Sequence, residues 1–182
     1  MARNFFCSLM ASEKLPSLIY RGVFYDGATK AEVHDGALVV RGAMEDHDVY
    51  TGLKDINSYA ISAPVADTDK VDIVDYVDVS HGEIMGVFYR EGIKTFGLTC
   101  PAGVGTRVRI PMIGDTFYIA EDNFASAPTV GEFAVPTAGS TLYTPAAAEA
   151  TTKFCVKVEA EKAVTQGVVN TGKEYFCRVV NA

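Results

Sequence analysis

Short stretches of alternating apolar and polar residues follow one another along the chain, divided by Gly, Asp and Pro. Alternation with a period of two is typical of strands that bury one face. The expected strands cover residues 18–25, 37–41, 71–79, 84–90, 93–98, 106–112, 115–120, 129–135, 154–159 and 174–180. Many short strands at such spacing are typical of barrels and sandwiches. We therefore predict an all-β fold, an antiparallel β-barrel or sandwich with an extended N-terminal arm.

The C-terminal pair of stretches gives the clearest local signal. Residues 154–159 and 174–180 are separated by a polar segment that contains Asn170, Thr171 and Gly172. Two alternating runs joined by turn residues predict a β-hairpin. The one candidate helix, residues 145–150, has about two turns and would be marginal by itself.

The division of the chain follows from where this periodicity begins. Residues 1–17 have weak periodicity and end in Leu-Pro-Ser, which predicts an arm, and residues 18–182 form a single β domain. Residues 57–69 are polar and rich in turn formers, so we expect a surface connection there, with a possible subdomain junction near 57–70. We find no internal repeat.

The composition of the chain narrows the classes of partner that we expect it to bind. Of the 182 residues, 48% are hydrophobic and 21% charged, which excludes global disorder. The net charge of −7 and the absence of a basic patch argue against binding to nucleic acid or to anionic membranes. The first residues lack a standard secretory signal, and no stretch reaches the ~20 apolar residues that span a bilayer, so we expect a soluble protein.

Four cysteines, Cys7, Cys100, Cys155 and Cys177, lie far apart and form no CxxC pair. This spacing supports neither a zinc ribbon nor a thioredoxin-type site, and we expect reduced thiols. Cys155 and Cys177 lie on the two arms of the predicted hairpin. Strand alternation places their thiols on opposite faces unless a bulge intervenes.

No residue pattern predicts catalysis, and we expect no enzyme, cofactor or metal. A series of carboxylates lacks the glycine at the sixth position of an EF-hand loop: Asp67, Asp69, Asp72, Asp75 and Asp78. The segment 102–106 lacks the Lys of a Walker loop and is expected to be a turn. Cys100 has no nearby base, and none of His34, His47 and His81 belongs to an HExxH motif.

Adjacent aromatic pairs recur in the expected strands, at 24–25, 88–89, 117–118 and 175–176. In a strand one ring points inward and its neighbour outward. Ordinary sheet packing explains such pairs, and outward Tyr rings can also form a surface that binds sugars or proteins.

From Arg109 onward the order of features carries a resemblance to a known family. Ile110, the segment 114–117, a following loop, the segment 130–136 and the closing hairpin come in that order, and the run 35–40 matches an early segment. In these features the chain resembles the capsid decoration, or cement, proteins of tailed bacteriophages.

The resemblance implies a non-enzymatic virion structural protein, made in the host bacterial cytoplasm. Such a protein binds the exterior of an assembled capsid and stabilises contacts between subunits of the major capsid protein. It is expected to be a homo-oligomer, with a trimer favoured.

The arm supplies the candidate partner-binding residues: Arg3, Phe5, Phe6, Leu9 and Met10. Apolar anchors beside a charge are typical of interface cores, although the same residues would equally complete the protein's own core. Two other functions remain open. One is a receptor- or glycan-binding module of a phage head fibre or tail, which would use outward tyrosines. The other is a metal-dependent hydrolase built around His47 or His81.

Overall fold

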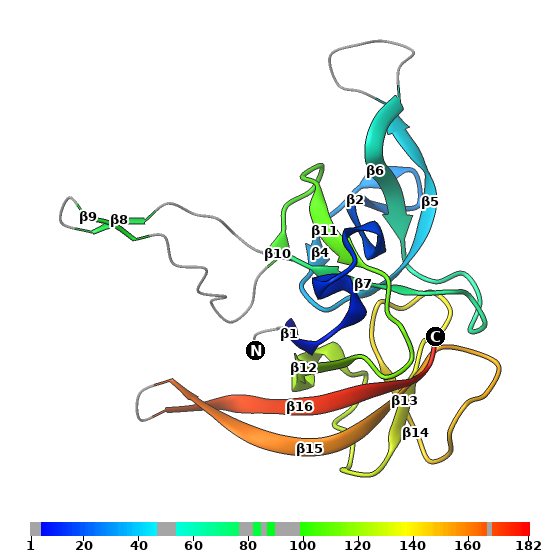
Figure 1. Ribbon diagram of the computed structural model, residues 1–182, viewed down its shortest axis with the longest axis vertical. Coiled ribbons are helices and arrows are strands. Elements are labelled where there is room, and N and C mark those ends of the chain that lie inside the picture. The colour runs from blue at the N-terminus through cyan, green and yellow to red at the C-terminus, as the bar shows by residue number, and fades with distance from the viewer. Residues whose placement is uncertain (1–4, 47–53, 77–81, 85–86, 90–98, 167–168) are drawn as a thin grey trace.

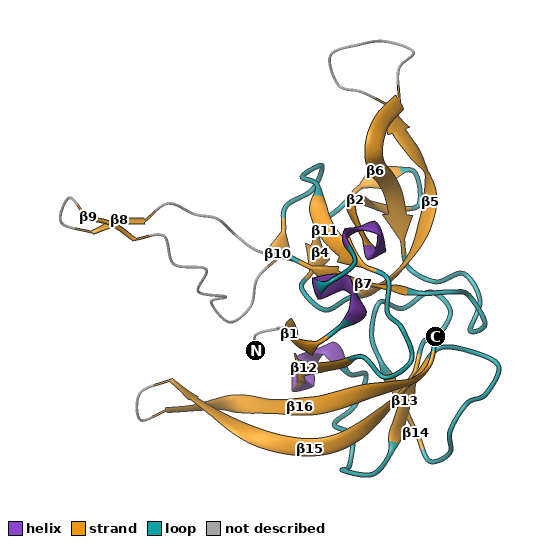
Figure 2. Ribbon diagram, viewed as in Figure 1, coloured by secondary structure: helices purple, strands orange, loops and turns teal. Residues whose placement is uncertain are grey.

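The computed structural model describes residues 5–46, 54–76, 82–84, 87–89, 99–166 and 169–182. Within these ranges nearly all regular structure is β, so the predicted all-β class is confirmed (Figures 1 and 2). The described helices are single 3₁₀ turns: η1 (Ala11–Glu13), η2 (Pro16–Leu18) and η3 (Glu121–Asn123).

Five strands close into a barrel. Around it they follow in the order β11, β7, β5, β6 and β2, and β2 pairs with β11 to complete the circle. The pairs are antiparallel except β2 with β6, which is parallel. Closure leaves none of these strands with a free edge. The bounds are β2 (Ile19–Asp26), β5 (Leu38–Asp46), β6 (Lys54–Ser62), β7 (Asp72–Asp75) and β11 (Thr106–Arg109).

A six-stranded antiparallel sheet lies below the barrel in Figure 1. In spatial order its strands are β1 (Phe5–Leu9), β12 (Thr116–Ala120), β16 (Val169–Asn181), β15 (Cys155–Gln166), β13 (Phe133–Val135) and β14 (Thr144–Ala146). Short pairings complete the fold: β3 (Thr29–Lys30) with β2, β4 (Val33–His34) with β10 (Thr99–Cys100), and β8 (Gly82–Ile84) with β9 (Val87–Tyr89).

Alternation along β5 and β7 builds two cores. Leu38 and Ile73 point out of the barrel into a core shared with the six-stranded sheet, where they join Phe117 and other inward residues. Val39 and Val74, one position later, fill the barrel interior. The barrel wall is therefore buried on both faces where it meets the sheet, and this fixes the two layers against each other.

The predicted C-terminal hairpin is confirmed and is longer than its sequence signal. β15 and β16 pair from Cys155↔Asn181 to Gln166↔Val169, and they reach beyond the rest of the sheet in Figure 1. The polar segment 170–172 lies within β16, so the predicted turn position is wrong. A register shift between Val164 and Thr165 and the positive φ of Gly172 let the strand continue through these turn-forming residues.

Two further local predictions are wrong. The surface connection expected at 57–69 begins with a barrel strand, because β6 is held by β2 on one side and by β5 on the other. The candidate helix at 145–150 starts in β14 instead, an edge strand paired with β13, where Pro145 needs no partner for its missing N–H. Both outcomes depend on pairing between distant segments, which local composition does not carry.

Three of the four cysteines have described side chains, and a register shift lies beside one of them, between Cys155 and Val156. Cys100, Cys155 and Cys177 are free and buried. Across the hairpin Cys177 pairs with Val158 and Cys155 with Asn181, so the two cysteines are not cross-strand neighbours. Burial raises the pKa of the Cys100 thiol to about 11, which keeps it protonated at neutral pH.

Candidate functional site

The N-terminal segment is an edge strand of the six-stranded sheet. Phe5 and Phe6 lie in β1, whose backbone pairs with β12, and Arg3 lies outside the described residues. Met10 is only 2% exposed and belongs to the core shared by barrel and sheet, whereas Leu9 is 62% exposed. Of the predicted partner-binding residues, Met10 therefore completes the protein's own core, and Leu9 is open to a partner.

Hydrogen bonds fasten the residues after β1 to the loop before β12. One carboxylate serves both segments: Asp115 Oδ1 accepts from the Ala11 N–H at 2.7 Å, and Asp115 Oδ2 accepts from the Met112 N–H at 2.8 Å. Asp115 itself is buried. Because an ionised acceptor forms stronger hydrogen bonds than a neutral one, Asp115 holds the two segments firmly together.

A buried ion pair anchors the same region to the barrel. Arg109 Nε donates to Asp75 Oδ2 at 2.5 Å, and Arg109 Nη1 donates to Ser12 Oγ at 2.8 Å. Arg107 also contacts Asp75, at 2.6 Å. Asp75, which interrupts the apolar face of its strand in the sequence, is thus paired with two guanidinium groups.

Each of the two fastened segments carries exposed apolar side chains. Leu9 and Leu15 come from the first segment, and Met112 and Ile113 come from the second, with exposed fractions between 45% for Met112 and 67% for Ile113. These four residues are called the apolar patch below. Asp115 joins the backbones of the two segments that carry these residues, and the first segment follows edge strand β1 directly.

The outer face of the six-stranded sheet carries an aromatic pair, as the strand alternation predicts. Phe117 and Tyr175 are buried, and their neighbours Tyr118 and Phe176 lie on the other face with ring centroids 5.0 Å apart. Lys162 Nζ lies 4.9 Å from the Tyr118 ring centroid. Tyr118, Phe176 and Lys162 form what is called the aromatic face below.

The residues considered for metal binding have other partners or lie outside the described ranges. Asp67 accepts from the Ala138 N–H and Asp69 from the N–H groups of Val65 and Ala66. Asp72 accepts from the Tyr20 hydroxyl at 2.6 Å, and Asp75 binds the two arginines. Within the described part of the chain no three His, Cys, Asp or Glu side chains come together as metal ligands.

The remaining candidates for chemistry are the three histidines, Asp78 and the segment 102–106. His34 Nδ1 shares a hydrogen bond with Thr99 Oγ1 between β4 and β10. Asp78, His47 and His81 lie outside the described residues. The segment 102–106 begins in the predicted turn, with the Val104 N–H bonded to the Pro101 carbonyl and Gly103 at φ +77°.

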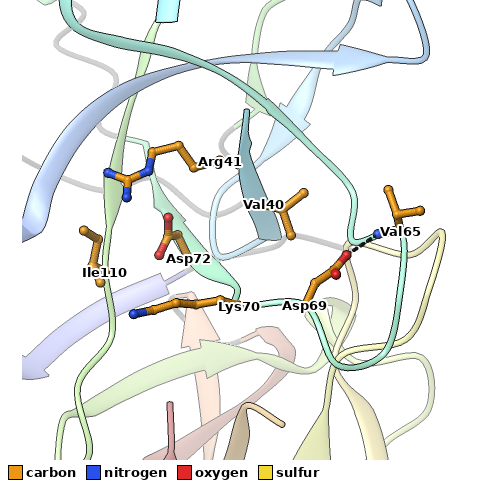
Figure 3. A pocket seen from close by; sticks show the side chains of 7 residues that line it. All are labelled: Val40, Arg41, Val65, Asp69, Lys70, Asp72 and Ile110. Atoms are coloured by element: carbon orange, nitrogen blue, oxygen red, sulfur yellow. Dashed lines mark hydrogen bonds between the residues drawn. The ribbon is translucent and has the colours of Figure 1, made fainter. Parts of the chain in front are cut away.

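A pocket of about 440 Å³ opens beside the barrel, and sequence reasoning missed it (Figure 3). Its lining side chains are Val40, Arg41, Val65, Asp69, Lys70, Asp72 and Ile110. They come from β5, from the connection between β6 and β7 with the start of β7, and from the residue after β11. No motif joins these segments in the sequence, so only the barrel's pairing brings them together.

Comparison with known proteins adds no identification: no family model, curated protein or solved structure matches this chain. No helix among the described residues has the length and apolar character needed to cross a bilayer.

Proposed function

We propose that this protein is a non-enzymatic virion structural protein that binds the exterior of an assembled phage capsid and stabilises contacts between major capsid subunits. The observation that carries the proposal is the apolar patch. Leu9, Leu15, Met112 and Ile113 leave apolar side chains in water, which is typical of a surface that a protein partner covers.

The surroundings of the patch suit this role. β1 lies at the edge of its sheet, so its outer backbone groups can pair with an extended segment of a partner. The patch is held by buried contacts of Asp115 and Arg109, so little ordering entropy is lost when a partner covers it.

The mechanism is additive. Each copy contributes modest buried area, and many copies on one particle together resist expansion of the shell, especially if each binds as a homo-oligomer. A trimer is the form that the resemblance to decoration proteins favours. The partner is the major capsid protein, and the protein is located on the capsid surface.

Substitution in the apolar patch tests the proposal. Leu9→Ser combined with Ile113→Ser should abolish attachment to purified heads while leaving the fold intact, because both side chains are exposed. Val130→Ser, an exposed apolar residue outside the patch, is the matched control and should attach normally. Normal attachment of the double variant would reject the patch as the contact surface.

These point substitutions are more informative than deletion of residues 1–11. That deletion would also remove β1 and the buried Met10, so loss of attachment would not distinguish a missing contact from a damaged core. Attachment by such a truncated chain is therefore informative only beside a measurement of its stability.

One observation supports a second candidate, a receptor- or glycan-binding module of a head fibre or tail. The aromatic face places Tyr118 and Phe176 side by side with Lys162 over the Tyr118 ring. Such aromatic surfaces can stack against sugar rings. Saturable binding to host cell-wall polysaccharide, lost in Tyr118→Ala, would favour this alternative over capsid attachment.

A further inference from the structure

The pocket beside the barrel has two cations that form no ion pair. Arg41 and Lys70 both line it, both are exposed, and neither lies in a salt bridge with any residue of the described chain. The same lining carries two carboxylates, Asp69 and Asp72, so the pocket is neutral overall in a protein whose net charge is −7. Because neither cation forms a salt bridge, an anion from outside the chain can bind Arg41 and Lys70 together.

The Arg41 guanidinium is held in place. It lies 5.2 Å from the ring centroid of Tyr20 and 5.2 Å from that of Tyr59, and these two rings pack edge to face. Cation–π contacts use the face of the guanidinium and leave its N–H groups free to donate. The Arg41 side chain therefore loses less conformational entropy when its N–H groups bind an anion.

The two carboxylates of the pocket have hydrogen-bond donors of their own, and the charges of Arg41 and Lys70 also act on Asp72. Asp72 is 5% exposed and accepts the Tyr20 hydroxyl hydrogen bond. Asp69 accepts the backbone N–H groups of Val65 and Ala66 at 2.7 and 2.8 Å. Figure 3 shows Asp69 turned toward Val65, on the side of the pocket away from Arg41.

The lining and the volume of the pocket narrow the chemical class of its ligand. Val40, Val65 and Ile110 supply apolar surface beside the cations, so an anion attached to an apolar group matches the lining. A planar carboxylate matches the fork of an arginine, and a single negative charge is repelled less by Asp72 and Asp69 than a phosphate dianion would be. The volume of about 440 Å³ holds a side chain or a short aliphatic acid.

We propose that this pocket binds a carboxylate joined to an apolar group, with Arg41 and Lys70 holding the carboxylate and Val40, Val65 and Ile110 contacting the apolar part. The carboxylate comes either from an acidic side chain flanked by apolar residues in a partner protein or from a free aliphatic acid. The site is separate from the apolar patch and does not depend on the proposed capsid role.

The test is a titration of the isolated full chain, followed by NMR chemical shifts. The probes are hexanoate, its neutral analogue hexanamide, inorganic phosphate, and the acetylated, amidated peptides Leu-Leu-Glu-Leu-Leu and Leu-Leu-Gln-Leu-Leu. Hexanoate or the Glu peptide should shift the amides of the pocket residues saturably, at least about tenfold more tightly than hexanamide, the Gln peptide or phosphate. The tighter of the two carboxylates identifies the source.

Two variants locate the binding, and one variant is the matched control. Arg41→Gln should weaken carboxylate binding about tenfold, and Lys70→Gln about threefold because an ammonium binds as a point charge. Lys70 is exposed and unpaired, so its replacement keeps the fold even if the loss of Arg41 disturbs Tyr20. Lys14→Gln, which changes an exposed lysine elsewhere by the same charge, should leave binding unchanged.

Three results would overturn the proposal. One is the absence of saturable shifts with both carboxylates. Another is equal affinity for the charged and neutral probes. The third is an equal loss of carboxylate affinity in the Lys14 control and the Lys70 variant. That result would mean that the affinity depends only on the overall charge of the protein. None of these results bears on capsid attachment, which is measured on particles.

Discussion

Asp115 joins the two segments of the apolar patch, and its removal should release them. Asp115→Ala deletes two hydrogen bonds from a buried carboxylate, one to the Ala11 N–H at 2.7 Å and one to the Met112 N–H at 2.8 Å. Hydrogen bonds to charged groups contribute about 1.5–3 kcal/mol each. Met112 is partly exposed, so water can replace one of the two partners. We therefore expect the free energy of unfolding to fall by about 2–4 kcal/mol.

Asp69→Ala is the matched control. Asp69 also accepts two backbone N–H groups, at 2.7 and 2.8 Å, but both lie within its own exposed turn. Urea unfolding measures the two losses, and the control should lose less than about 1 kcal/mol because its N–H groups are resolvated. Asp115→Ala should also attach more weakly to heads, whereas Asp69→Ala should attach normally. Equal stability losses in the two variants would refute the argument that Asp115 fastens the patch.

Three further predictions concern the two cores and the buried Asp72. Gly22→Ala should lower the free energy of unfolding by about 1–3 kcal/mol in urea, because the added Cβ would lie 2.7 Å from Ile61 Cδ1 inside the barrel; an unchanged value would show a looser barrel. Tyr143→Phe should raise thermal stability by about 1 kcal/mol, since the buried Tyr143 hydroxyl has no hydrogen-bond partner in the described protein, and a loss would disprove this. Burial raises the pKa of Asp72 above 3.8, so the folded state favours its protonated form and loses stability as pH rises through that raised pKa. Asp72→Asn removes this loss. The free energy of unfolding of the variant minus that of the native protein should therefore increase between about pH 4 and pH 7. A difference that stays constant would contradict the raised pKa.

Local alternation was enough to predict where many strands lie. The strands β2 and β12 fall within a residue or so of the expected ranges, and the inward residues of the C-terminal hairpin are those that the alternation selects. In each case one face of the strand is buried and the other is exposed to solvent or half-buried. A period of two appears in a sequence under this condition. This is why the all-β class was predictable.

Pairing between distant segments was not predictable. β6 looks polar by itself and becomes a strand because β2 and β5 flank it. Asp75 looks like a break in an apolar face, and only the pairing of β7 with β11 shows that Arg109 lies within its reach. The pocket cations Arg41 and Lys70 have the same origin, since their proximity depends on the closure of the barrel. Contacts of this kind leave no signal in a local window.

The proposed function requires that the protein attach to assembled heads. Density-gradient fractionation of a lysate from the source tests it most directly, with the ratio of this protein to the major capsid protein measured in the particle band. We expect the protein to band with heads at a fixed, high ratio. Recovery of the protein free near the top of the gradient, with none in the particle band, would contradict it.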